Sequence, residues 1–254
     1  MNKSVVAAQL YTLRDFTKTE ADIRTTFERV SEIGYKAVQI SALGKIEISD
    51  LREIADKNEL EIIASHISYD LIVNETQKVI DDHKKLSCRH VAIGGLPTEF
   101  RNKDGFQRFA LECSEAVKPI IEAGLTFSYH NHSFELQKFG DRTGLDILVE
   151  ESDPAYFSFE IDTYWIQHGG GNPVSCLRRL KDRMHIVHLK DMAMDGTQQL
   201  FAEVGEGNLE WEGILSACQN ANIEWYIVEQ DVCQGDPFES LEVSLNNLKK
   251  MGLN

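Results

Sequence analysis

Eight short apolar runs, each followed by a segment with helical periodicity, most restrict what this chain can fold into. The runs are SVVAAQLYT, KAVQIS, LEIIASHIS, HVAIGGL, LTFSYHNH, YFSFEIDT, HIVHLKD and IEWYIVEQD. Strict alternation of strands and helices indicates a parallel sheet. Eight such units within 254 residues match the size of an α/β fold of the (β/α)8 barrel type. We therefore expect one barrel domain over residues 1–254.

The segments between the runs place apolar residues on one helical face and stop at glycine. Residues 19–33 precede Gly34, and residues 104–123 precede Gly124 in the same way. The other expected helices cover residues 49–58, 75–86, 143–151, 173–181, 211–220 and 237–251. A doubly wound open sheet is the competing fold, but the first run continues into QLYTLR instead of a glycine-rich phosphate-binding turn.

Polar side chains close nearly every run. In a barrel these strand ends meet on one face, which is where active sites lie. They include Gln9, Tyr11, His66, His130, His132, Asp162, His188, Lys190 and Glu229. Four of the eight histidines therefore gather at one end of the expected barrel, and this indicates a functional site.

Four of these residues form the expected metal site: His130, Asp162, His188 and Glu229, one from each of runs five to eight. Imidazole and carboxylate groups bind Zn²⁺, Mn²⁺, Co²⁺ or Mg²⁺. Adjacent strands lie ~4.8 Å apart, so side chains at neighbouring ends can reach one ion. Residues two apart on a strand share a face, so we expect Glu160 to lie deeper than Asp162, in an ion pair.

Each of the four also has a purely structural interpretation. His188 could be a hydrogen-bonded core histidine, and Asp162 could cap the following helix. Glu229 is hardest to explain this way, because an unpaired buried carboxylate is very costly. His83, His90, His168 and His185 are interpreted as surface, loop or packing residues. The metal interpretation explains the set of four better than separate structural roles do.

The bulk composition excludes several classes of partner. A net charge of −15 argues against nucleic acid, which is bound through many Lys and Arg contacts to phosphate, and against an anionic membrane surface. No run approaches the ~20 apolar residues of a membrane span, and none has a signal-peptide core. The five scattered cysteines fit reduced thiols, so we expect a cytoplasmic protein.

The motifs in their order resemble the xylose isomerase-like (β/α)8 barrels, also called sugar phosphate isomerases/epimerases or the AP endonuclease 2 family. The resemblance rests on QLYTLR, YHNHSFEL, EIDTYW, HIVHLKDM, GEGNLEW and IVEQD, and covers the whole chain. It implies one divalent ion held at the ends of strands five to eight by Glu, Asp, His and Glu. By position, Asp162, His188 and Glu229 match the last three ligands.

The chain departs from this pattern at the first ligand, where His130 stands in place of a glutamate. We expect His130 to bind the ion, with Glu135 as an acid/base or supporting group; the reverse assignment stays open. The YHNH ending resembles the subgroup with inosose dehydratase-like and keto-sugar lyase-like members. Trp165 replaces a histidine of the epimerase pattern, and an arginine after strand seven is missing, which argues against psicose-type epimerisation. With a histidine ligand, Mn, Zn or Co is expected over Mg.

The resemblance implies a sugar isomerase or epimerase that abstracts a proton next to the carbonyl of a keto-sugar or related polyol, through an enediolate. The alternative is a metal-dependent dehydratase or lyase on a keto-inositol or 3-keto-glycoside. An AP endonuclease and a non-catalytic sugar-binding barrel fit the sequence less well. The expected proton-transfer residues are Glu135, His66 and Lys190, and the expected substrate-binding residues are His132, Tyr11, Trp165 and Gln9. The substrate is the expected partner, and a homo-oligomer is possible.

Overall fold

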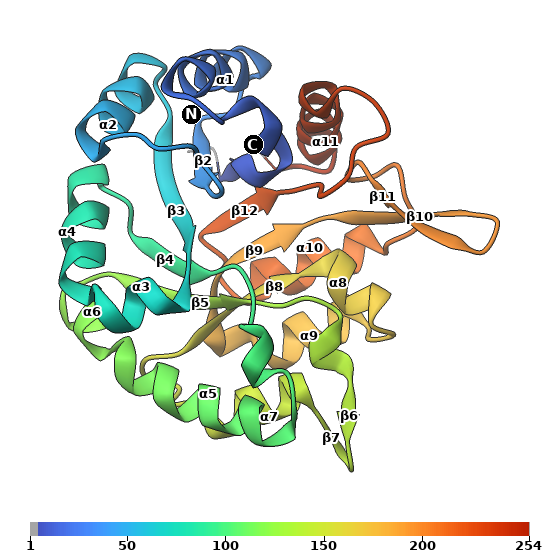
Figure 1. Cartoon of the computed structure of the whole chain (residues 1–254). Helices are drawn as coiled ribbons and strands as arrows, with labels where there is room; N and C mark the ends of the chain where they lie inside the picture. The colour runs from blue at the N-terminus through green and yellow to red at the C-terminus, as the bar shows by residue number, and fades with distance from the viewer. Residues whose placement is uncertain (1–4, 254) are drawn as a thin grey trace.

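The computed structural model describes residues 5–253, and its centre is a closed barrel of eight parallel strands (Figure 1). The strands follow one another around the barrel in chain order, and the first pairs with the last. Their bounds are β1 (Val6–Gln9), β2 (Ala37–Ile40), β3 (Glu61–Ile67), β4 (His90–Ile93), β5 (Thr126–His130), β8 (Ser158–Asp162), β9 (Met184–Leu189) and β12 (Trp225–Val228). The expected (β/α)8 barrel is confirmed.

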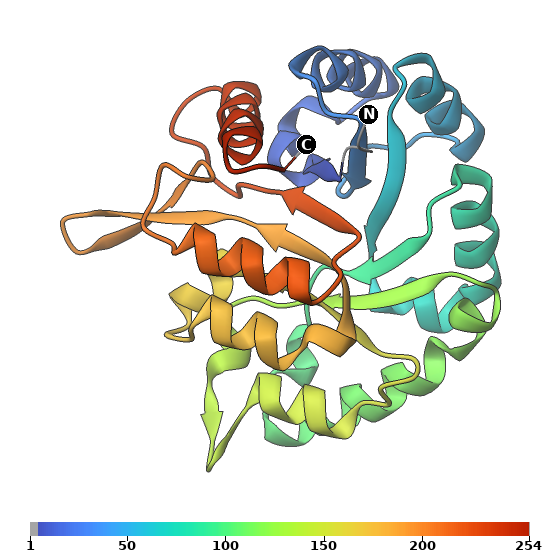
Figure 2. The ribbon, with the colours of Figure 1, turned by 180° about the vertical axis from the view of Figure 1, so that it is seen from behind.

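Helices surround the barrel on its outside. They are α1 (Glu20–Ile33), α2 (Ile48–Lys57), α3 (Tyr69–Asn74), α4 (Thr76–Leu86), α5 (Lys103–Ala116), α6 (Lys118–Glu122), α7 (Gly144–Glu151), α8 (Thr163–His168), α9 (Pro173–Arg179), α10 (Trp211–Asn220) and α11 (Pro237–Lys250). From behind, α9 and α10 lie side by side outside the strands (Figure 2). Within residues 5–253, no helix has the length and apolar character that crossing a membrane requires.

Local signals explain where the helices begin and end. Thr19 caps α1 through its side chain, and Gly34 ends the helix in the left-handed conformation with φ of 110°, which glycine adopts without strain. The single helix expected over residues 104–123 was wrong, because the structure has α5 and α6 separated at Val117. Pro119 lies in the first turn of α6, where its missing N–H costs no helical hydrogen bond.

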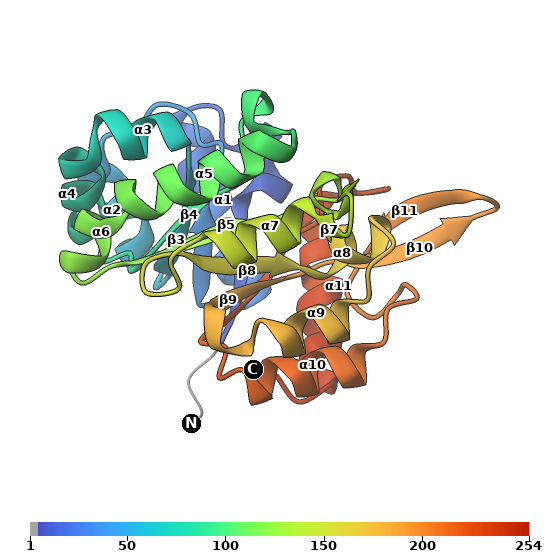
Figure 3. The same ribbon diagram turned by 90° about the horizontal axis from the view of Figure 1, so that it is seen from below.

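Two hairpins interrupt the alternation. One pairs β6 (Lys138–Phe139) with β7 (Arg142–Thr143), and the other pairs β10 (Asp191–Asp195) with β11 (Gln198–Ala202). The second hairpin extends well beyond the ring of helices (Figure 3). It follows β9 directly, so it rises from the same barrel end as the expected site.

The barrel interior changes from apolar to polar along β1, β2, β9 and β12. Ala7, Ala37, Ile186, Trp225 and Ile227 belong to a small buried cluster that is separate from the core between strands and helices. Two residues further along, the same faces carry Gln9, Gln39, His188 and Glu229, all buried. The apolar end fills the barrel, and the polar end forms the floor of the site.

Candidate metal centre

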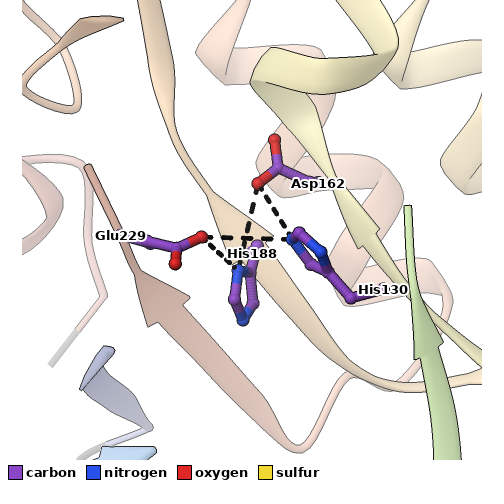
Figure 4. A group of neighbouring side chains, drawn as sticks. All are labelled: His130, Asp162, His188 and Glu229. Carbon is purple, nitrogen blue, oxygen red and sulfur yellow. Dashed lines mark hydrogen bonds and ion pairs between the residues drawn. The ribbon is translucent and has the colours of Figure 1, made fainter. Parts of the chain in front are cut away.

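Four side chains converge at the ends of adjacent strands (Figure 4). They are His130, Asp162, His188 and Glu229, and all four are buried. Their donor atoms lie within 4.8 Å of one another. His130 Nε2 is 3.3 Å from Asp162 Oδ2, and His188 Nδ1 is 3.0 Å from Glu229 Oε2. The structure thus brings together the four residues that were expected to meet.

The geometry of the four donors suits one divalent ion. His130 Nε2 is 4.0 Å from Glu229 Oε2, and His188 Nδ1 is 3.9 Å from Asp162 Oδ2. Donors held about 2.0–2.2 Å from a common ion lie roughly 3–4 Å from each other. Two imidazoles and two carboxylates match the preferences of Zn²⁺, Mn²⁺ and Co²⁺. The four residues are therefore a candidate site for one divalent ion.

Asp162 combines two functions in one carboxylate. Its Oδ1 accepts a hydrogen bond from the Trp165 backbone N at 2.9 Å and so caps α8. Its Oδ2 faces His130. Its backbone N also donates to Asn131 Oδ1 at 3.0 Å, which ties the end of β8 to the end of β5. The capping interpretation and the ligand interpretation are therefore compatible.

His188 is oriented by partners on its other ring nitrogen. Nε2 lies 2.7 Å from Gln39 Oε1 and 3.1 Å from Glu160 Oε1. Both oxygens can only accept, so Nε2 carries the proton and Nδ1 faces Glu229. Burial lowers the pKa of His188, but the carboxylates of Glu160 and Glu229 outweigh it and raise the pKa to about 10. Without a divalent ion, this imidazole is a cation among carboxylates.

Glu160 lies one pleat deeper than Asp162. Its Oε2 is 2.6 Å from His66 Nε2, so the two histidines His66 and His188 share this carboxylate. Despite burial, these two histidines hold the pKa of Glu160 well below its usual range. The ion pair expected for Glu160 is present, and it fixes the ring of His66 as well as that of His188.

A cavity of about 390 Å³ opens over these groups. Pockets for small molecules commonly have about 300–1,000 Å³. His66, His130, His132, Tyr11 and Glu229 line it. All five were expected to contact substrate or ion or to transfer a proton.

Glycine at the end of β4 gives two of these histidines their space. A Cβ on Gly94 would lie 2.9 Å from His66 Nδ1, and one on Gly95 would lie 3.1 Å from His132 Cε1. Any larger residue at Gly94 would displace the His66 ring. Glycine follows β4 at positions 94 and 95 because the rings of His66 and His132 occupy the volume that larger side chains would need.

Trp165 and Gln9 lie beside the cavity. The Trp165 ring is 5.1 Å from the His132 ring. Trp165 Nε1 and His132 Nδ1 are both buried and have no hydrogen-bond partner within residues 5–253. Gln9 is buried, and its Nε2 lies 3.5 Å from His66 Nδ1. Gln9 therefore faces His66, whereas His132 and Trp165 offer free polar atoms.

Glu135 lies apart from the four donors. Its carboxylate accepts a hydrogen bond from the Tyr129 hydroxyl at 2.6 Å and another from the His132 backbone N at 3.0 Å. Tyr129 packs against Phe109 and Phe157, in the layer between barrel and helices. The structure thus brings Glu135 to the outside of β5, where it fastens the chain that carries His132.

Lys190 faces the interior, as His188 does two residues before it. Its side chain is fully buried, and its ammonium contacts Asp162, Glu229 and Asp231. Burial opposes the charge, but these carboxylates raise the pKa of Lys190 well above its usual value. Lys190 is therefore a permanent cation beside the four donors.

Asp191, the next residue, fastens a different part of the chain. Its carboxylate accepts hydrogen bonds from the backbone N of Gly205, Gly207 and Leu209, at 2.9, 3.1 and 3.2 Å. It also accepts one from Trp211 Nε1 at 2.6 Å. The GEGNLEW motif therefore closes the base of the β10–β11 hairpin against the end of β9.

Sequence reasoning missed Gln39 and Asp231. Gln39 is the polar residue inside the run AVQI, and its place two residues after Ala37 puts it on the interior face. Asp231 lies two residues after Glu229. The two-residue spacing that linked His130 to His132 contained the signal for both residues.

A larger hollow of about 710 Å³ lies at the opposite barrel end. Both of its arginines are already paired with acidic residues, since Arg89 contacts Glu224 at 2.7 Å and Arg52 contacts Asp56. His90 and Trp225 also line it. The smaller cavity, over the four donors, is therefore the candidate for chemistry.

A family profile described as xylose isomerase-like TIM barrel matches residues 27–251. The chain belongs to this family. An inosose dehydratase of Mesomycoplasma hyopneumoniae is 25% identical over 97% of this chain and 95% of its own. A solved sugar phosphate isomerase/epimerase of Parabacteroides distasonis superposes with a TM-score of 0.81 at 21% identity, covering 99% and 96% of the two chains. A solved L-ribulose 3-epimerase superposes with a TM-score of 0.73 at 14% sequence identity, covering 98% of this chain and 94% of its own. Relatives and neighbours are thus named as enzymes of small sugar-like substrates.

Proposed function

We propose that this protein is a divalent-metal-dependent enzyme that abstracts a proton next to the carbonyl of a keto-sugar or keto-polyol, through an enediolate. The convergence of His130, Asp162, His188 and Glu229 under a sugar-sized cavity carries the proposal. A bound ion would act as a Lewis acid that makes the C–H next to a carbonyl more acidic.

Other residues of the site would orient the metal ligands and bind the substrate. Gln39 and Glu160 hold His188 in the orientation that a ligand needs. His132 and Trp165 provide polar atoms for substrate hydroxyls, and Tyr11 forms part of the wall. Burial, together with the nearby His130 and Lys190, lowers the pKa of His132 to about 3. His132 is therefore neutral near pH 7 and can accept a hydrogen bond.

His66 is the proposed proton-transfer residue on the cavity wall. Its Nε2 is held by Glu160, and Nδ1 is directed toward Gln9. Burial lowers the pKa of His66 below its usual value, although Glu160 opposes this. A neutral imidazole held in place by a carboxylate suits a general base. Glu135, by its contacts, is assigned to supporting the end of β5.

Two outcomes can follow proton abstraction. Return of the proton to another carbon, or to the opposite face, gives isomerisation or epimerisation. Loss of a hydroxyl from the neighbouring carbon gives dehydration. The inosose dehydratase relatives span nearly the whole chain, whereas the epimerases at 14 and 21% identity support the fold alone. Dehydration of a keto-polyol therefore has the stronger support.

Incubation in D₂O with a panel of keto-sugars and keto-inositols tests the proposal. Proton NMR is expected to show loss of the C–H signal next to the carbonyl, only when Mn²⁺ is present. The product, an epimer or a dehydrated ketone, separates the two outcomes. Elemental analysis is expected to give about one ion per chain.

Asp162→Asn and Glu229→Gln are expected to lose both metal and exchange. Asparagine keeps an oxygen to cap α8, so folding is preserved. Asp195→Asn, on the exposed hairpin, is the matched control for the loss of one charge. Turnover without loss of a C–H proton would point to hydride shift or hydrolysis and would contradict the proposal.

A further inference from the structure

The ammonium of Lys190 is completely enclosed by protein. Nζ lies 2.9 Å from Asp162 Oδ2, 2.7 Å from Glu229 Oε2 and 2.5 Å from Asp231 Oδ2. An ammonium has three N–H donors; one of them bonds to Asp231, and the ammonium forms ion pairs with Asp162 and Glu229. The Trp165 and Phe201 rings lie 5.5 and 5.8 Å from Nζ and present their faces to the charge.

Two of these three oxygens belong to the candidate metal site. Asp162 Oδ2 and Glu229 Oε2 are the atoms that face His130 Nε2 and His188 Nδ1. Asp231 lies outside that group of four. Two partners of Lys190, Asp162 and Glu229, therefore also belong to the candidate metal site, whereas Asp231 does not.

The negative charges of Asp162 and Glu229 explain why a buried lysine lies between them. Asp162 and Glu229 are buried carboxylates at close range, and their repulsion is strong in a medium of low dielectric constant. A cation between them removes that repulsion. A divalent ion on the same oxygens would be repelled by the ammonium, unless the ammonium moves toward a partner that the ion does not use.

We propose that Lys190 is a resident cation of the metal-free site, and that Asp231 retains its ammonium when a divalent ion binds Asp162 and Glu229. This inference rests on the proposed metal site. Lys190 and Asp231 thereby set the affinity for the ion without binding it. They are positioning residues for the metal.

The backbone permits this exchange. The Lys190 backbone N donates to Thr163 Oγ1 at 3.0 Å, and Thr163 Oγ1 donates to the Lys190 carbonyl at 2.8 Å. The main chain is therefore held from both sides. Only the long side chain of Lys190 has to change its contacts, and its partner Asp231 is already in contact.

Calorimetric titration of Mn²⁺ into chelator-treated protein tests the inference. Lys190→Met is expected to bind Mn²⁺ about tenfold more tightly than wild type, and Asp231→Asn about tenfold more weakly. In the Lys190→Met background, Asp231→Asn is expected to change the affinity by less than about threefold, because its partner is gone. If Asp231 acts by retaining the ammonium, Asp231→Asn weakens binding only while Lys190 is present. If Asp231 simply attracts the ion, Asp231→Asn weakens binding equally in both backgrounds.

Thermal melting supplies a second readout. Metal-free Lys190→Met is expected to melt several degrees below wild type, and Mn²⁺ is expected to raise its melting temperature more than that of wild type. Lys190→Gln repeats the test if the methionine variant does not fold. Lys181→Met and Asp195→Asn remove the same charges at exposed positions and are expected to leave the affinity unchanged.

Two results would overturn the inference. One is Mn²⁺ affinity in Lys190→Met that equals or falls below that of wild type. The other is an Asp231→Asn effect of equal size in both backgrounds. If neither wild type nor Lys190→Met binds Mn²⁺, the proposed metal site itself fails; if both bind one ion equally, only the role of Lys190 fails.

Discussion

The side chain of Gln39 joins two interior residues from distant parts of the chain. Its Oε1 lies 2.7 Å from His188 Nε2, and its Nε2 donates to Glu160 Oε1 at 2.9 Å. The amide oxygen keeps a proton on His188 Nε2, so Nδ1 is the nitrogen that can bind an ion. A residue of β2 thereby orients His188 of β9, which belongs to the proposed metal site.

Gln39→Met is expected to weaken Mn²⁺ binding about 10- to 100-fold, because partners of metal-bound histidines have effects of this size. Methionine has a similar volume, so the fold is expected to persist. Calorimetric titration measures the change. Gln219→Met on the exposed face of α10 is the control. An unchanged affinity for Gln39→Met would show that the tautomer of His188 does not depend on this contact.

Substitutions of His130 and His132 are expected to affect different quantities, metal affinity for His130 and turnover for His132. His130→Ala removes a donor that faces Asp162 and Glu229, so it is expected to weaken Mn²⁺ binding tenfold or more. His132→Ala is expected to keep the metal and to lower turnover about 100-fold, the scale of a lost proton-transfer or positioning group. Calorimetry and NMR exchange measure the two quantities. A metal-bound crystal structure with Glu135 on the ion would reverse the assignment of His130.

Glu135 is expected to make stability depend on pH. Burial raises its pKa to about 7, although the hydrogen bonds from Tyr129 and from the His132 backbone oppose the rise. The neutral carboxyl is favoured in the fold, so its stabilising effect is complete below about pH 4.5, the value for an exposed glutamate. It is lost as pH rises to about 7, at a cost of roughly 3 kcal/mol in total.

Glu135→Gln removes this dependence. The free energy of unfolding of the variant, relative to wild type, is expected to increase from pH 4.5 to 7 and then to stay level. Urea unfolding at four pH values between 4.5 and 8 measures it. Glu212→Gln, exposed on α10, provides the baseline. Parallel curves for wild type and Glu135→Gln would contradict a buried carboxyl of this kind.

Much of the fold could be predicted from sequence, because alternation of strands and helices allows few topologies. Each of the eight runs contains a barrel strand. The β10–β11 hairpin was not predicted, since DMAMD and QQLFA lack the regular polar alternation of a strand with one buried face. The break between α5 and α6 was missed, although Pro119 marks it.

The meeting of the four donors followed from their places at strand ends, because strand ends converge in a barrel. Contacts across the barrel did not follow in the same way. Gln39 reaches His188 across the interior, and such a pairing depends on how far neighbouring strands are staggered. The turn of Glu135 toward Tyr129 also could not be foreseen, because it depends on the short helical turn at residues Phe134–Leu136.

The carboxylate of Asp191 anchors the base of the β10–β11 hairpin at the barrel rim. Its bonds to Gly205, Gly207 and Leu209 clamp the returning strand at the barrel rim. A Cβ on Gly207 would lie 2.4 Å from Asp191 Oδ1, so this closure admits only glycine there. The tip at residues 195–198 lies at the far end of the hairpin from this closure, so a change of length there leaves the clamp at the rim in place.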